Sequence, residues 1–298
     1  MSFGIPFFVT FKIQETKSIK MKLNKNVWLS LSSIMVLSMI ISCGVKKSDV
    51  KKENNVHESD GVSKPEWVSI FNGTDLTGWT IKIPGHPLGE NFGNTLRVED
   101  SILKIRYDAY GPEFNDRFGT VYFDRYLTDY RIKVEYRFVG ETAQGAPNWG
   151  YRDSGIQFYG QPPATQKMDQ AFPVCLEYNF HGGNGTDDRP LGAACTNGMF
   201  IEYNGQKNTT TCIAADVSKT FHGDQWVTAE IDVRDGKITH YVNGEEILNY
   251  ANPTYNVENE TAKMLITGSG AKVKGGYVSL QSNSHPIDFR KIELLEYK

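Results

Sequence analysis

The chain has 298 residues and a formal net charge of −3, which allows one large domain or two ordinary ones. Charged residues make up 22% and aromatic residues 12%, which excludes wholesale disorder and is typical of many strands joined by tight turns. Residues 1–66 hold 10 Lys and 6 acids, so the chain from residue 67 onward carries a net charge of −7. An acidic body without a basic stripe argues against nucleic-acid binding.

The N-terminal segment predicts an export signal. Lys22 and Lys25 are followed by an apolar run over 27–41 and then by Cys43. This is the layout of a secretory signal peptide, and its ending resembles a bacterial lipobox, in which Cys43 is lipidated. A membrane-spanning helix is the alternative, but the run is short and Ser-rich beside the ~20 apolar residues of a span. We expect a lipid-anchored protein of the cell envelope, periplasmic or at the cell surface, that contacts the membrane through the anchor only.

The signal-peptide pattern also divides the chain into segments. Met21 precedes the charged segment, so residues 1–20 are interpreted as a mis-called extension of the signal peptide at 21–43. Residues 44–66 are polar and predict a flexible tether. The remaining residues, 67–298, predict the folded domain.

Short strands and turns are predicted throughout the folded domain. Residues 95–107 and 130–138 alternate between apolar and polar side chains, and residues 276–284 and 287–297 close the chain with two more strands. Within 226–250, the dipeptides Asp235-Gly236 and Asn243-Gly244 predict hairpins. No long helix and no repeat is visible, and we predict one all-β sandwich.

Export would also allow the cysteines to form a disulfide. Beyond Cys43 there are Cys175, Cys195 and Cys212, and an oxidising compartment permits one disulfide. Cys195 and Cys212 lie in a loop-rich region with the turn-forming Asn204-Gly205 between them, whereas Cys175 lies in an expected strand. We therefore pair Cys195 with Cys212; three free thiols are the alternative.

Seven segments in order carry a resemblance to a known family. They are FNGTDLTGW (71–79), GENFGNTLRVED (89–100), YRIKVEYRF (130–138), YRDSGIQFYG (151–160), FPVCLEYN (172–179), HGDQWVTAEIDVRDGKITHYVNGEEIL (222–248) and VSLQSNSHPIDFRKIELLEY (278–297). Together they resemble the 3-keto-disaccharide hydrolase family, also called 3-keto-α-glucoside-1,2-lyase/3-keto-2-hydroxy-glucal hydratase domains, in a Bacteroidetes-type lipoprotein. The resemblance implies a concanavalin A-like jelly-roll β-sandwich of two curved antiparallel sheets. It also implies an enzyme acting on glycosides oxidised at C3.

The chemistry that the resemblance implies needs three kinds of group. A ketone at C3 makes the C2 proton acidic, so a base can remove it while the C1 substituent leaves, and water can add back to the enone. This requires a general base, an acid for the leaving oxygen, and donors for the enolate oxygen. Family members commonly have Asn where Asp153 stands, and often Gln where Asn179 stands.

Period-two alternation selects the candidate residues. Glu177, Asn179 and His181 share the polar face of one strand, and Asp153 and Gln157 that of another. If the two strands are neighbours, the pKa of one carboxyl rises, which suits acid/base work. Glu177 and Asp153 are therefore the predicted catalytic residues. The predicted substrate-binding residues are Gln157, Asn179, Gln281, Arg152, Tyr159, His181 and Trp149.

Several of these residues have a second interpretation. Arg152 falls in the apolar register, Trp149 suits either a sugar face or the core, and His181 precedes two glycines and suits a loop at the edge of the site. Glu177 and His181 lie about 13 Å apart at roughly 3.3 Å per residue and cannot share an ion unless the strand ends between them. No cofactor is certain, metal ligands are unknown, and a divalent metal stays open because the loop at 183–188 is rich in oxygen ligands.

Two other functions compete with cleavage of 3-keto-glycosides. The departures at Asp153 and Asn179 motivate a non-catalytic carbohydrate-binding lipoprotein. A conventional glycosidase using Asp153 and Glu177 is the other, since carboxylates about 5 Å apart suit a retaining mechanism.

Overall fold

The computed structural model describes residues 64–268 and 270–297. The predictions for Met21, for Cys43 and for most of the tether lie outside the described residues. No helix in 64–268 or 270–297 is long and apolar enough to cross a membrane.

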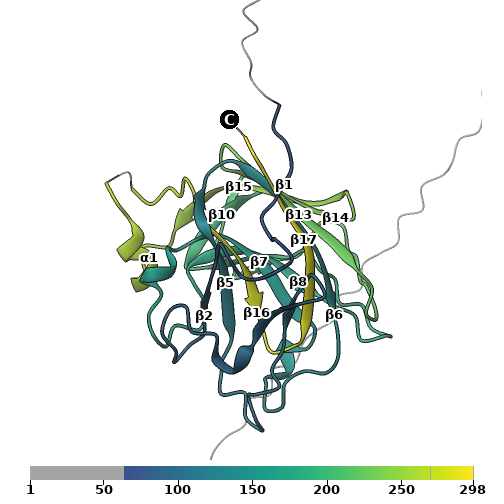
Figure 1. Ribbon diagram of the computed structural model, residues 1–298. Coiled ribbons are helices and arrows are strands. Elements are labelled where there is room, and N and C mark those ends of the chain that lie inside the picture. The colour runs from purple at the N-terminus through teal and green to yellow at the C-terminus, as the bar shows by residue number, and fades with distance from the viewer. Residues whose placement is uncertain (1–63, 269, 298) are drawn as a thin grey trace, which may run out of the picture. The chain divides into compact units, whose positions relative to one another are not determined.

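Two antiparallel sheets form the described domain (Figure 1). The ten-stranded sheet follows the order β11 (Gln206–Asn208), β10 (Met199–Tyr203), β15 (Glu245–Tyr255), β14 (Lys237–Val242), β13 (Val227–Arg234), β6 (Tyr130–Phe138), β17 (Ile287–Glu296), β4 (Ile102–Ile105) and β3 (Leu96–Glu99), with β1 (Val68–Ser69) also on β17. The seven-stranded sheet follows the order β12 (Cys212–Ile213), β9 (Ala194–Asn197), β8 (Cys175–His181), β7 (Asp153–Gly160), β16 (Gly276–Ser282), β5 (Gly119–Leu127) and β2 (Trp79–Lys82). The predicted all-β jelly-roll sandwich is confirmed.

The local patterns form the predicted elements. Along β6, buried and half-buried residues alternate at every position, as a strand with one face in the core requires. Asp235 and Gly236 have φ of 51° and 71°, and Asn243 and Gly244 have φ of 49° and 82°. Positive φ at both central residues is what a type I′ turn demands, so the two predicted hairpins form between β13, β14 and β15.

Helical structure in the described ranges is short. The 3-10 turns are η1 (Phe92–Asn94), η2 (Asn148–Gly150) and η3 (Pro163–Thr165). The α-helix α1 (Glu260–Leu265) spans 6 residues, and the side chain of Asn259 caps it by accepting the N–H of Ala262 at 2.9 Å. One turn and a half is too short to show a helical period, so the sequence did not reveal it.

A single apolar core lies between the sheets. It takes Ile132 and Val134 from β6, and Ile156 and Leu176 from the facing sheet. Tyr136 of β6 stacks on Phe180 of β8 with ring centroids 4.0 Å apart. The seven-stranded sheet thus turns one face to this core and leaves its other face for polar side chains.

Candidate active site

The register of three neighbouring strands gathers the predicted polar residues. β8 pairs with β7 so that His181 lies opposite Asp153 and Glu177 lies opposite Gln157. On its other side, β7 pairs with β16, where Ser279 lies opposite Gln157. Because side chains alternate along a strand, the polar residues of all three strands share the face turned away from the core.

A cavity of about 380 Å³ opens over this face. Both predicted catalytic residues line it together with four of the predicted substrate-binding residues. These are Asp153, Glu177, Gln157, Asn179, Gln281 and Trp149. Segments more than 100 residues apart in the sequence therefore meet at one hollow.

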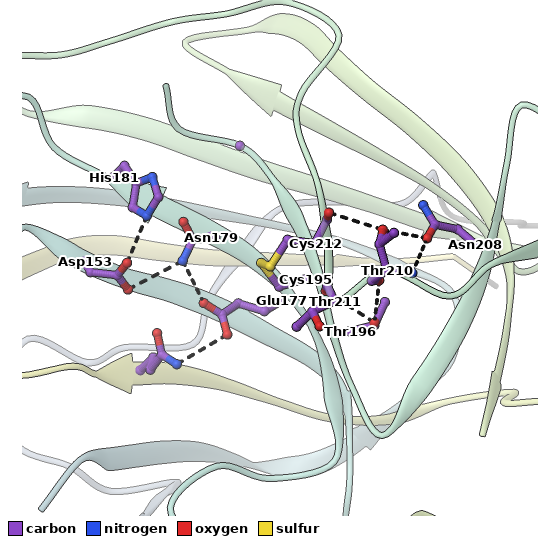
Figure 2. Close-up of a disulfide and its surroundings, with 12 residues drawn as sticks. Asp153, Glu177, Asn179, His181, Cys195, Thr196, Asn208, Thr210, Thr211 and Cys212 are labelled. Atoms are coloured by element: carbon purple, nitrogen blue, oxygen red, sulfur yellow. Dashed lines mark hydrogen bonds and ion pairs between the residues drawn. A yellow bond between two sulfur atoms is a disulfide. The ribbon is translucent and has the colours of Figure 1, made fainter. Parts of the chain in front are cut away.

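Asp153 is buried at the start of β7, and three side chains hydrogen-bond it. Its Oδ2 lies 2.9 Å from His181 Nε2, and its Oδ1 accepts from the amides of Asn283 at 2.5 Å and Asn179 at 3.5 Å. Figure 2 shows Asp153 joined by dashed lines to His181 and to Asn179. These three hydrogen bonds orient the carboxyl at the edge of the cavity.

Glu177 borders the cavity from the middle of β8. Its Oε1 accepts from Asn179 Nδ2 at 3.2 Å, and its Oε2 accepts from Gln281 Nε2 at 3.3 Å. Burial and, next, the negative charge of Asp153 raise the pKa of Glu177 to about 8, although both hydrogen bonds act in the opposite direction. Glu177 therefore carries a proton at neutral pH, and the amide of Asn179 bridges the two carboxyls (Figure 2).

Four amide atoms around the carboxyls lack a hydrogen-bond partner among the described residues. They are Gln157 Nε2, Asn179 Oδ1, Gln281 Oε1 and Asn283 Oδ1. All four residues are buried and line the cavity. Buried polar atoms are normally hydrogen-bonded, so this set calls for a polar ligand or water. Sugar hydroxyls both donate and accept, and they fit a mixture of one donor and three acceptors.

Gly155 makes room for the Glu177 side chain. A Cβ at position 155 would lie 2.8 Å from both Cγ and Oε1 of Glu177, closer than real contacts allow. The Glu177 carboxyl occupies the space above Gly155.

We expect Gly155→Ala to lower kcat/KM roughly ten- to a hundredfold, because the Glu177 carboxyl must move, and to lower the free energy of unfolding by about 1–3 kcal/mol through overpacking. Steady-state kinetics and urea unfolding measure both effects. Gly268→Ala is the matched control, because a Cβ there meets nothing within 4 Å. Wild-type kinetics for Gly155→Ala would show that the position of Glu177 does not matter.

One side of the cavity is aromatic. Trp149 is 52% exposed, and its ring stacks on Phe118 with centroids 5.2 Å apart, while Phe118 lies 4.9 Å from Phe172. Trp149 and Phe172 both line the cavity. An exposed indole supported from behind offers a platform for the apolar face of a sugar.

A disulfide forms another part of the cavity wall. Cys195 of β9 lies directly opposite Glu177, and Cys212 of β12 lies opposite Cys195. The bond between Cys195 and Cys212 confirms the predicted pairing, and Cys175 is the free, buried thiol among the described cysteines. Figure 2 shows the disulfide beside Glu177, next to Thr196 and Thr211, which also line the cavity.

Two predicted substrate-binding residues lie elsewhere. Tyr159 is 2% exposed and belongs to the core. The prediction that it shares the polar face is wrong, because the register of β7 against β16 shifts before Gly160 and Tyr159 takes φ of 51°. The Arg152 guanidinium donates to the carbonyl of Gly223 at 2.6 Å and to Asp224 at 3.1 Å, so it braces a loop and does not line the cavity.

His181 lies behind the cavity lining. It contacts Asp153 rather than the cavity itself, which differs from the predicted substrate contact. Along β8 the strand separates His181 from Glu177, as the sequence indicated. Across the sheet, however, both residues approach Asp153, since β7 runs beside them.

Some residues that line the cavity were not predicted from the sequence. Asn283 continues the alternation after Gln281, and this pattern pointed to its face. Phe172 and Thr211 come from connections, and Thr196 and Asn197 come from the 4-residue strand β9, which is too short to show a period.

The proposed loop for a metal uses its oxygens in other ways. Asn184 Oδ1 accepts the N–H groups of Thr186 and Asp187 at 3.0 and 2.8 Å, which forms a side-chain turn. No group of three or more His, Cys, Asp or Glu residues suited to a metal occurs between residues 64 and 297 as described.

Comparison with known proteins finds one matching family and several structures of similar fold. The family model described as a 3-keto-alpha-glucoside-1,2-lyase-like domain matches residues 66–295. No curated protein matches. Among solved structures, a candidate glycosyl hydrolase from Parabacteroides distasonis ATCC 8503 is 15% identical, with 78% of this chain and 94% of that chain covered and a TM-score of 0.46. The catalytic domain of an endo-1,3-beta-glucanase from Thermotoga petrophila RKU-1 is 13% identical, with coverages of 79% and 100% and a TM-score of 0.44.

Proposed function

This chain belongs to the 3-keto-α-glucoside-1,2-lyase-like family, and on that premise we propose that it cleaves 3-keto-glycosides by elimination across C1–C2, hydrates the resulting enone, or does both. The protein is carbohydrate-active, as an enzyme or as a binder. One observation carries the enzyme proposal. Two carboxyls bridged by a single amide lie on one cavity, and one of them, Glu177, has a pKa of about 8.

The two carboxyls divide the proton transfers. Asp153 takes the C2 proton, the electron pair of the C2–H bond forms the C1=C2 double bond, and the C1–O bond breaks. Glu177 gives its proton to the departing oxygen. Negative charge develops on the C3 oxygen. Gln157 Nε2, which has no hydrogen-bond partner in the protein, donates a hydrogen bond to this oxygen.

Purified full-length protein and p-nitrophenyl 3-keto-β-glucoside test this proposal, with p-nitrophenolate release and enone absorbance as readouts. The corresponding unoxidised glucoside is the matched control. Release from the keto compound alone supports the proposal. Binding by calorimetry without turnover overturns it in favour of a carbohydrate-binding protein.

A conventional glycosidase is the second candidate. A protonated carboxyl beside another acid is also the arrangement of a retaining glycosidase, which supports this alternative. Turnover of the unoxidised glucoside at a comparable rate would establish it and displace the keto-specific proposal.

We also propose that the protein is exported and anchored by a lipid on Cys43. The signal-like layout of residues 21–43 supports this, and a disulfide is characteristic of oxidising compartments. Metabolic labelling with radioactive palmitate, followed by immunoprecipitation, tests the anchor. Absence of label, or label that persists in Cys43→Ser, would contradict it.

A further inference from the structure

The imidazole of His181 lies between two oxygen atoms. Its Nε2 is 2.9 Å from Asp153 Oδ2, and its Nδ1 is 3.3 Å from the carbonyl oxygen of Pro190. A carbonyl oxygen can only accept, so Nδ1 carries a hydrogen. Nε2 and Oδ2 then need a second proton between them, because two bare lone pairs would otherwise face each other.

The surroundings of Asp153 decide where this second proton resides. Asn283 and Asn179 each donate an N–H to Oδ1, and donors to a carboxyl favour its ionised form. The side chain of His181 is 34% exposed and that of Asp153 is 8% exposed. Water can therefore hydrate a charged imidazole, whereas the enclosed carboxylate needs a partner of opposite charge. The geometry places the proton on His181.

We propose that His181 is a positioning residue which, as an imidazolium, makes Asp153 the base and leaves Glu177 as the acid. This inference rests on the proposed function. Asn179 bridges the two carboxyls; burial raises the pKa of Glu177, and an imidazolium at Oδ2 stabilises the carboxylate of Asp153. His181 acts from behind the cavity through Oδ2, while Oδ1 accepts the amides of Asn283 and Asn179.

Other charged or titratable groups surround the pair and belong in any account of its pH dependence. Arg189 donates to the carbonyl of Gly182, next to His181, and Arg152 precedes Asp153 but is held by Asp224. Glu177 shares the Asn179 amide with Asp153, and His222 accepts the N–H of Gly185 in the loop after His181. Both arginines make their contacts away from Asp153. Among the described residues, His181 is therefore the basic side chain that hydrogen-bonds Asp153.

A kinetic comparison of His181→Gln with His181→Arg tests the role. Glutamine keeps a donor but no charge, so we expect kcat/KM to fall roughly ten- to a hundredfold at pH 6–7 with little change in KM. The acidic limb of the pH profile should move upward, because Asp153 loses its hydrogen-bonded cation. His181→Arg keeps a cation and should restore the position of that limb. An equal loss at every pH in both variants would indicate a merely structural role and overturn the proposal.

His86→Gln is the matched control, since His86 forms another histidine–carboxylate pair, with Glu90 at 2.8 Å, outside the cavity lining. Its pH profile should match that of the wild type.

Nitrogen-15 NMR of histidine-labelled full-length protein provides a readout that needs no substrate. At pH 7, both ring nitrogens of His181 should show the shifts of protonated nitrogen, with the signal assigned by its loss in His181→Gln. In Asp153→Asn the ring should become neutral. A neutral His181 ring in the wild type would overturn the proposal whatever the kinetics show. If no 3-keto-glycoside is turned over, the proposed function and the assignment of roles both fail, and the NMR result still decides the protonation of the pair.

Discussion

Glu177→Gln is expected to lower kcat for a 3-keto-glycoside roughly 10²–10⁴-fold, the usual contribution of a positioned acid or base. Glutamine has nearly the same shape as a protonated glutamate, so substrate binding and the fold should survive. The new glutamine amide can donate a hydrogen bond to Gln281. A rotation of the Gln281 amide by half a turn brings its Oε1, which has no hydrogen-bond partner, into the position of Nε2. Steady-state kinetics with calorimetric binding separates the loss of turnover from any loss of affinity.

The pH dependence of activity follows from the same group. Glu177 acts as an acid only while it holds its proton, and its pKa is raised to about 8. We therefore expect the wild-type rate to fall as the pH rises through about 8. The residual rate of Glu177→Gln should lack this alkaline limb.

Stability should also fall as the pH rises. The ordinary pKa of 4.5 applies to unfolded Glu177, and the value in the folded protein is about 8. Between these values the folded state holds a proton that the unfolded state releases, so the free energy of unfolding falls as the pH rises through this window. Glu177→Gln has no such proton, and its stability relative to wild type should increase from pH 4.5 to pH 8. Urea unfolding at pH 5 and pH 8.5 measures the difference; a pH-independent difference would mean that the carboxyl is not perturbed.

Removal of the disulfide is the second large effect. Cys195 and Cys212 are 17 residues apart, and a loop of this size corresponds to about 3 kcal/mol of stability. For a domain of this size, that should lower Tm by about 6–12 °C in Cys195→Ser/Cys212→Ser. Differential scanning fluorimetry and kinetics on the same samples measure the outcome.

Loss of the disulfide should also weaken substrate binding. β12 consists of 2 residues and pairs with β9 only at Cys212 and Ile213, so the disulfide supplies much of its attachment. Thr211 and Cys212 line the cavity on this side. We expect KM to rise more than kcat falls, because the wall loosens while Glu177 and Asp153 stay in place.

Dithiothreitol provides the matched control for this prediction. Reduced wild type should behave like the double variant, and the double variant should not respond to the reagent, which excludes an effect through the buried thiol of Cys175. A double variant with the Tm and KM of the wild type would show that the disulfide supports neither the fold nor the cavity.

The two departures from the family motif touch each other. The resemblance implies Asn at the position of Asp153 and Gln at that of Asn179, and the amide of Asn179 lies 3.5 Å from Asp153 Oδ1. The same amide reaches Glu177. An added carboxylate and a shortened amide therefore act on one hydrogen-bonded group, so their consequences for substrate or rate must be tested together.

The sequence by itself determined the strands, their faces and several members of the site. The side-chain period of a strand is local, so it assigned Glu177 and Asn179 to the polar face of β8 and Asp153 and Gln157 to that of β7. The turn dipeptides placed the hairpins of β13, β14 and β15 because positive φ is a local requirement. The loop positions of Cys195 and Cys212 likewise indicated their bond.

Only the tertiary structure decided which of these residues act together. A register shift turned Tyr159 into the core, and Asp224, distant in sequence, drew Arg152 away from the cavity. Strand pairing brought His181 and Glu177 to the same Asp153, although β8 alone separates them. The raised pKa of Glu177 arises from burial and from a carboxylate on the neighbouring strand. Registers, bulges and burial depend on partners far along the chain, and periodicity within one strand carries no information about them.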